Sequence, residues 1–198
     1  MCPDLRGFGK SSKTADTPDH EGSSKRAKAR DCVGLMETLG FPSFAVAGHD
    51  RGGYVAYRTA LDHPERVSRL AVLGGIPIIE RLEQCDARFA QAWWHWFFYG
   101  QPDKPERANR ADPEAWYGAV RETDGAEAYA NFLEAIRDPA TVHGLVNNYR
   151  AGLGCGRCGT IPPFWPATWS ASGDAGLWMC AVGGSIAPTT WRRRRRRS

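Results

Sequence analysis

Residues 44–53 read Phe-Ala-Val-Ala-Gly-His-Asp-Arg-Gly-Gly, an apolar run that stops at a corner with glycine on both sides of an aspartate. A short run of apolar residues is typical of a strand that is buried on both faces. Glycine lets the backbone turn sharply where a side chain would collide with the next element. The stretch therefore predicts a buried strand, a tight turn at Asp50, and a helix that begins directly after it.

The turn at Asp50 matches a pattern that presents a reactive side chain. The spacing Gly48-His49-Asp50-Arg51-Gly52 is that of a nucleophile elbow, which exposes one residue at the carboxyl end of a sheet. The free N–H groups and the dipole of the following helix favour an anion at this point. An aspartate there can attack carbon, displacing a halide or opening an epoxide, and water then hydrolyses the resulting ester with help from a histidine base.

A second interpretation of Asp50 is structural. Aspartate is a common residue at the start of a helix, where its side chain accepts a hydrogen bond from a free backbone N–H. Capping alone does not require glycine at both 48 and 52, so the spacing favours the nucleophile. If Asp50 is the nucleophile, the backbone N–H of Arg51 can donate to the oxyanion that forms when the ester is hydrolysed.

Strands and helices alternate on both sides of the elbow. Residues 23–40 have helical spacing, with Ser23 or Ser24 as the cap and Gly40 as the stop. A helix is expected to follow the elbow and to end at Pro64, and the apolar run 67–75 is expected to form a second strand. Strand, helix and strand in this order predict a parallel sheet covered on both faces, so the fold class is α/β with residues 1–78 as its core.

The character of the chain changes twice after the core. Residues 79–150 hold amphipathic, aromatic-rich stretches and no strand pattern, which predicts a helical cap. Residues 151–198 form an atypical tail: between Leu153 and Trp191 only Arg157 and Asp174 are charged, and the tail ends in six arginines, 192–197. We find neither helical nor strand periodicity in it and expect no regular structure. Such a composition is typical of a GC-rich gene translated in the wrong frame.

Charge and cysteine content argue against several kinds of partner. The net charge of +4 comes from the tail, because removing its six arginines from 26 basic residues leaves 20 against 22 acidic ones. Nucleic-acid binding is not expected, since the arginine run lacks interleaved aromatic residues. The six cysteines, including the Cys155–Cys158 pair, are expected to be free thiols without a metal. The absence of an apolar span or leader predicts a cytoplasmic protein without a membrane partner.

Four segments carry a resemblance to a known family: PDLRGFGKSS at 3–12, the stretch 39–73 that contains GHDRGG and LDHPERV, HWFFYGQPDKPE at 95–106, and NNYRAG at 147–152. In this order they resemble the α/β-hydrolases, and within them the haloacetate (fluoroacetate) dehalogenases, with the epoxide hydrolases as close relatives. The resemblance implies an α/β-hydrolase-type parallel sheet with a helical cap insertion. It also implies a small-molecule substrate, a haloacid or an epoxide, and no cofactor, and it leaves a homodimer open.

The resemblance implies a role for each matching position. Asp50 looks like the nucleophile and Arg51 like the guanidinium that grips the substrate carboxylate. His95, Trp96 and Tyr149 look like the cap residues that hold the leaving halide, although aromatic packing alone would also account for the first two. Tyr54 stands where the dehalogenases usually carry a second arginine, and its hydroxyl can donate to a carboxylate without adding charge. Tyr149 with Tyr117 would suit an epoxide hydrolase, which generally protonates the ring oxygen with paired tyrosines.

Three departures from the family pattern bear on catalysis. Gly74 stands where the catalytic acid is expected, no histidine occurs after His143, and the strands that precede the PDLRGFG segment in the family are absent. The resemblance therefore implies a chain truncated at both ends, with the base and the acid missing. Such a chain is either a hydrolase whose ester intermediate accumulates or a non-catalytic fragment of one.

Overall fold

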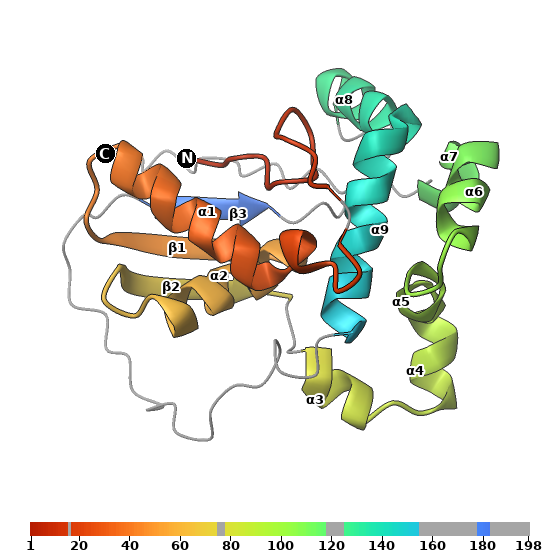
Figure 1. The fold of residues 1–198 in the computed structure, drawn as a ribbon, viewed down its shortest axis with the longest axis horizontal. Helices are drawn as coiled ribbons and strands as arrows, with labels where there is room; N and C mark the ends of the chain where they lie inside the picture. The colour runs from red at the N-terminus through yellow and green to blue at the C-terminus, as the bar shows by residue number, and fades with distance from the viewer. Residues whose placement is uncertain (16, 75–77, 118–124, 155–177, 183–198) are drawn as a thin grey trace, which may run out of the picture.

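The computed structural model describes residues 1–15, 17–74, 78–117, 125–154 and 178–182. Its sheet has three parallel strands in the order β2-β1-β3 (Figure 1). The strands are β1 (Phe44–His49), β2 (Val67–Leu73) and β3 (Trp178–Val182). Val46 lies opposite Leu70 on one side and Met179 on the other, so β1 is the central strand. The predicted parallel pairing of the first two strands is confirmed.

Two helices cover one face of this sheet. Helix α1 (Lys25–Thr38) follows the short 3-10 turn η1 (Glu21–Ser23), and the N–H of Ala27 in its first turn donates to the Ser24 hydroxyl at 3.0 Å. Helix α2 (Arg51–Asp62) begins at the elbow and packs against all three strands. The main core lies between these elements, where Met36, Phe44, Val46 and Val55 are at most 1% exposed.

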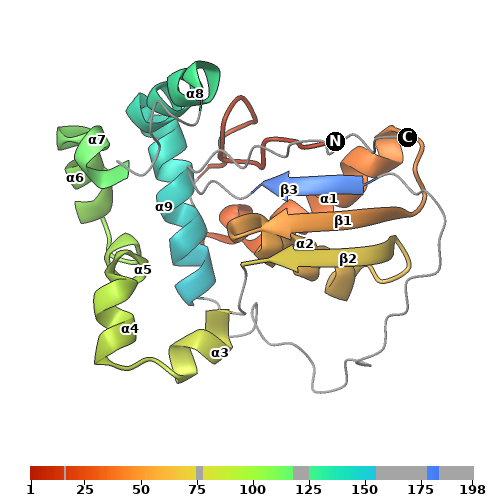
Figure 2. The ribbon, with the colours of Figure 1, turned by 180° about the vertical axis from the view of Figure 1, so that it is seen from behind.

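The opposite face of the sheet departs from the sequence prediction. Figures 1 and 2 place α1 and α2 on the same side, and within the described residues no helix covers the other side. Leu73, near the end of β2, is 39% exposed. The expectation of two covered faces is therefore wrong for the part of the chain that the structure describes. An apolar strand indicates that both faces of the sheet can be buried. Which segment of the chain packs on each face depends on the whole fold.

Strand β3 corrects a second expectation, because it lies in the tail for which the sequence predicts no regular structure. Its residues Trp-Met-Cys-Ala-Val form a five-residue apolar run that pairs in parallel with β1 from Ala45 to His49. A fully apolar strand has no alternating pattern to detect, and a run this short is not distinguished by periodicity. The rest of the expected tail, with the six arginines and the Cys155–Cys158 pair, lies outside the described residues.

Helices alone fill the described residues between 78 and 154. They are α3 (Ile78–Glu83), α4 (Ala87–Ala92), α5 (Trp94–Tyr99), α6 (Lys104–Ala111), α7 (Pro113–Tyr117), α8 (Ala126–Arg137) and α9 (Pro139–Gly154). Figure 2 shows α9 beside the carboxyl ends of the strands, with α4 to α7 on its far side. Helix α9 continues past the predicted boundary at residue 150. Among the described residues, none of these helices is long and apolar enough to cross a membrane.

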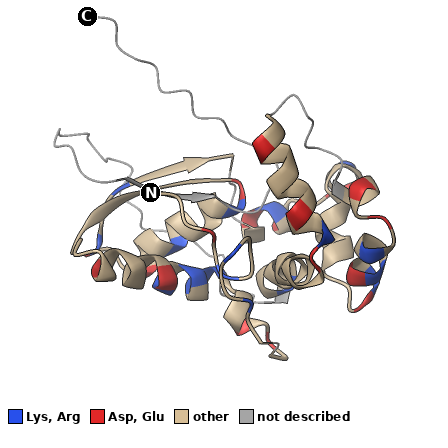
Figure 3. Ribbon diagram, turned by 90° about the horizontal axis from the view of Figure 1, so that it is seen from above, with Lys and Arg blue, Asp and Glu red and all other residues tan. Residues whose placement is uncertain are grey.

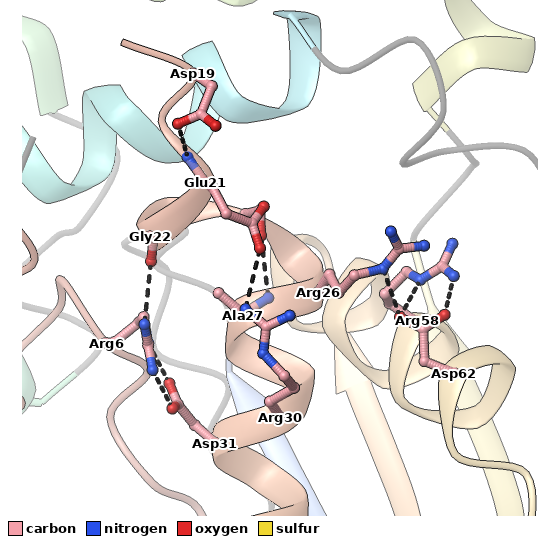
Figure 4. Close-up of polar contacts among 11 residues, drawn as sticks. Arg6, Asp19, Glu21, Gly22, Arg26, Ala27, Arg30, Asp31, Arg58 and Asp62 are labelled. Atoms are coloured by element: carbon pink, nitrogen blue, oxygen red, sulfur yellow. Dashed lines mark hydrogen bonds and ion pairs between the residues drawn. The ribbon is translucent and has the colours of Figure 1, made fainter. Parts of the chain in front are cut away.

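Ion pairs hold α1 in place from both sides. Figure 4 shows Arg6 of the N-terminal loop paired with Asp31 of α1, and Asp62 of α2 accepting hydrogen bonds from Arg58 and from Arg26 of α1. Each pair is partly exposed and contributes little by itself, but together they fix the loop and α2 against α1. Elsewhere, acidic and basic residues are interspersed along the helices (Figure 3).

Candidate active site

The elbow at Asp50 has the geometry that its glycines predict. Asp50 has φ 49° and ψ −117°, a left-handed backbone conformation that is costly for a residue with a side chain. Its N–H donates to the carbonyl of Leu73 at 2.9 Å, and its carbonyl accepts from the N–H of Gly53 at 3.0 Å. A Cβ at Gly48 would lie 2.1 Å from the carbonyl oxygen of Gly52. Only glycine at 48 lets the strand and the helix approach this closely.

The side chain of Asp50 does not cap α2. It is half-buried, and within the described residues it accepts no hydrogen bond from the first N–H groups of that helix. The capping interpretation is therefore not supported by the geometry. The carboxylate lies at the N-terminus of α2 and at the carboxyl end of β1, where a reactant could approach it.

Arg51 lies directly beside this carboxylate in sequence and is covered by Tyr149 of α9. The guanidinium carbon is 3.2 Å from the centre of the tyrosine ring, a close cation–π contact. Arg51 is only 5% exposed, whereas Tyr149 is half-buried. Residues that are almost one hundred positions apart thus meet at the end of the sheet.

Helix α5 adds two further aromatic residues. The His95 ring stands edge-on to that of Tyr149, with centroids 6.0 Å apart. Burial and the nearby Arg51 lower the pKa of His95, and Asp50 opposes the shift only in part. The imidazole is therefore neutral near pH 7 and offers one N–H donor. Trp96 is 8% exposed and is buried in a cluster with Tyr54. Tyr149 packs against this cluster.

Tyr54, where a second arginine was expected, is buried one turn into α2. It is 3% exposed and stands edge-on to Tyr57 at 6.1 Å between ring centres. Burial raises the pKa of the Tyr54 hydroxyl to about 12, although the Arg51 charge acts in the opposite direction. The hydroxyl therefore stays protonated and can donate a hydrogen bond, but the position adds no positive charge.

The structure brings the six predicted site residues together at the carboxyl end of the sheet. Of the histidines in the described residues, none is hydrogen-bonded to Asp50. Gly74, with φ 63°, follows β2, and a Cβ there would lie 3.5 Å from the ring of His49. Gly74 stands at the position where the resemblance implies the catalytic acid, and it has no carboxylate. Among the described residues, no cluster of histidine, cysteine and acidic side chains could hold a metal ion.

Two lysines beside the site were missed by the sequence analysis. Lys25 and Lys28 of α1 are 3% and 1% exposed, and the charge of Arg51 acts on the pKa of both. A signal for their burial was present, because they share the helical stripe of Ala29, Cys32 and Met36. Lysines in such a stripe are usually placed at its solvent edge, so periodicity alone would not have identified them.

Residues 1–115 match a known family, described as the alpha/beta hydrolase fold. The chain is 45% identical over 161 residues to a fluoroacetate dehalogenase from Burkholderia sp, a match that covers 77% of this chain and 53% of the relative. It is 38% identical over 105 residues to a soluble epoxide hydrolase from Corynebacterium sp., covering 52% of this chain and 35% of that one. The chain thus spans about half the length of the first relative and about a third of the second.

Solved structures agree with this match. A candidate alpha/beta hydrolase from Nostoc superposes with a TM-score of 0.72 at 40% identity, covering 76% of this chain and 54% of that one. A candidate epoxide hydrolase from Pseudomonas aeruginosa superposes with a TM-score of 0.70 at 33% identity, covering 93% of this chain and 72% of its own. The predicted fold class is confirmed.

Proposed function

The chain belongs to the alpha/beta hydrolase family, and from that premise we propose that Asp50 is a nucleophile that displaces halide from a small haloacid. Residues 1–78 would form the core that holds the nucleophile, and residues 79–150 the cap that closes over the substrate. The single observation that carries the proposal is Asp50 itself. Its backbone is strained, its carboxylate makes no capping hydrogen bond to α2, and the next residue is the buried Arg51.

The first chemical step follows from these positions. A carboxylate oxygen of Asp50 attacks the carbon that bears the halogen, a carbon–oxygen bond forms as the carbon–halogen bond breaks, and the halide leaves with the bonding electrons. Arg51 would hold the substrate carboxylate. The N–H groups of His95 and Trp96 and the hydroxyl of Tyr149 would donate to the departing halide, which needs directed donors in a dry pocket.

The second step would hydrolyse the ester on Asp50. It needs a base to activate water, and none of the described histidines is bonded to the nucleophile. We therefore expect the ester to form and to persist. This expectation provides the test, because a stable ester can be detected directly.

The test is exposure of the full chain to chloroacetate, followed by peptide mapping by mass spectrometry. The expected result is a carboxymethyl ester at Asp50 that is absent in Asp50→Asn. The exposed thiols Cys2 and Cys85 will also be alkylated, but hydroxylamine cleaves an ester and leaves a thioether intact. Asp86→Asn, which removes an exposed carboxylate on the cap side, is the matched control. Folded protein without a label at Asp50 would contradict the proposal.

An epoxide is the second candidate substrate. The side chain of Tyr117, which the sequence offers as the partner of Tyr149, lies outside the described residues. Tyr149 and the protonated Tyr54 lie on the same aromatic cluster, so two hydroxyl groups are available to protonate a ring oxygen. The soluble epoxide hydrolase relative supports this alternative. Styrene oxide in place of chloroacetate separates the two, because a label at Asp50 from the epoxide alone would favour epoxide chemistry.

A further inference from the structure

Three cationic side chains near the elbow are buried, and the charge of Arg51 acts on the pKa of the two lysines among them. Lys25 is 3% exposed, Lys28 is 1% exposed and Arg51 is 5% exposed. Buried cations are normally paired with an anion, because removing a charge from water costs several kcal/mol, on the order of the whole stability of a domain. We therefore ask which groups balance the charge of each of these side chains.

Lys28 has the weakest set of partners. Within the described residues its ammonium group makes no hydrogen bond and is fully shielded from solvent. The ammonium lies over the ring of Phe8, 5.0 Å from the ring centre. Asp31 exerts an attractive charge on it, but that carboxylate is already bonded to Arg6.

Lys25 connects this ammonium to the candidate active site. Lys25 and Lys28 are three residues apart and share one face of α1. The Lys25 ammonium donates to the carbonyl of Asn148 at 2.6 Å, and the next residue, Tyr149, covers Arg51 with its ring. The two lysines therefore lie against the segment of α9 that closes the site.

The charges around this cluster do not balance. Burial and the Arg51 charge hold the pKa of both lysines well below the usual value, which is the response of cations without an anion. Asp50 is the carboxylate next to Arg51, and Tyr54 adds a hydroxyl without charge. A small anion placed among the three cations would be stabilised by all of them.

We propose that Lys25, Lys28 and Arg51 form a buried site for a small organic carboxylate, in which the free ammonium of Lys28 supplies the second cation beside Arg51. The assignment of this carboxylate as part of the substrate rests on the proposed function. The site itself rests on the burial of the three cations and on the unbonded ammonium.

Acetate is the probe, because it has a carboxylate and no leaving group. Its binding to the full chain is measured by titration calorimetry at constant ionic strength, with acetamide as the neutral molecule of the same shape. Lys28→Met preserves the length of the side chain and removes its charge, and Lys10→Met, at an exposed position, is the matched control.

The expected result is that acetate binds and acetamide does not, and that Lys28→Met weakens acetate binding about tenfold or more while Lys10→Met leaves it unchanged. Equal acetate binding by the wild type and Lys28→Met, or no acetate binding by the wild type, would overturn the proposal. Should Lys28→Met fail to fold, thermal melting of the wild type decides, because equal stabilisation by acetate and acetamide would also overturn it.

This experiment is independent of the chemistry at Asp50. Acetate binding that depends on Lys28, without alkylation of Asp50, would refute the proposed function and support the anion site. Alkylation of Asp50 that is equally fast in Lys28→Met would support the proposed function and refute the assignment of this site to the substrate carboxylate.

Discussion

Gly48→Ala is the substitution whose effect follows most directly from the elbow. Gly48 does not have a left-handed backbone, so alanine is disfavoured there by space alone. Its Cβ would lie 2.1 Å from the carbonyl oxygen of Gly52, 2.3 Å from the carbonyl carbon of the same residue, and 2.6 Å from the backbone nitrogen of Gly53. All three atoms belong to the backbone of the first turn of α2, so no side chain can move aside.

The size of the effect can be estimated from these contacts. The first turn of α2 must retreat from β1 by about 1 Å before the contacts become tolerable, and overpacking of a tight core costs roughly 1–3 kcal/mol. Because the atoms are backbone, we expect the upper end, about 3 kcal/mol. A chain of this size loses roughly 2–4 °C of melting temperature per kcal/mol, so the midpoint should fall by roughly 6–12 °C.

Gly34→Ala provides the matched control. Gly34 lies within α1, and a Cβ there would meet no atom within 4 Å. Alanine is the better helix former by roughly 0.5–1 kcal/mol, so this variant should be more stable than the wild type. Urea denaturation followed by circular dichroism measures both. A Gly48→Ala variant within about 0.5 kcal/mol of the wild type would refute the close approach at the elbow, since surface substitutions already vary by that amount.

Two other predictions concern groups outside the candidate site. Asp62→Ala should lower the free energy of unfolding by about 1 kcal/mol at neutral pH. Burial raises the pKa of Asp62, but hydrogen bonds from Arg58 and Arg26 outweigh it and lower the pKa below 3.8, so the loss should disappear as pH falls through that lowered value. Urea denaturation at neutral and at acid pH tests this, and an equal loss at both would contradict it. Burial and then Asp31 raise the pKa of Cys32 to about 12, so iodoacetamide at about pH 8 should label the exposed Cys85 and spare Cys32 in peptide maps, and comparable labelling of both would be inconsistent with the core.

The local structure of the core could be predicted because short-range physics determines it. The apolar run 44–48 and the glycines around Asp50 correctly predict β1 and the turn into α2. Ser24 was one of two proposed caps for α1, and its hydroxyl accepts the expected hydrogen bond. Strand β3 was missed, because a run of five apolar residues shows no alternation that would identify a strand. Its pairing with β1 is visible only in the structure.

Apart from the elbow at Asp50, the candidate site was predictable only through the resemblance. Nothing in the spacing of His95, Trp96 and Tyr149 distinguishes a site from aromatic packing, and the structure finds Trp96 both packed in a cluster and near Tyr149. The lysines were not predicted, since their burial depends on α9, whose Asn148 is 123 residues from Lys25 along the chain.

The sequence by itself determined the strand, the elbow and the helix that follows it, since these depend on side-chain size and backbone freedom within a few residues. It also determined that the chain is an alpha/beta hydrolase relative, through motifs kept in order. Tertiary structure alone decided which face of the sheet is covered, that β3 pairs with β1, that Tyr149 covers Arg51, and that Lys25 and Lys28 are enclosed with it. These outcomes depend on contacts between segments far apart along the chain, and the cost of burying a charge is set only when the whole fold encloses it.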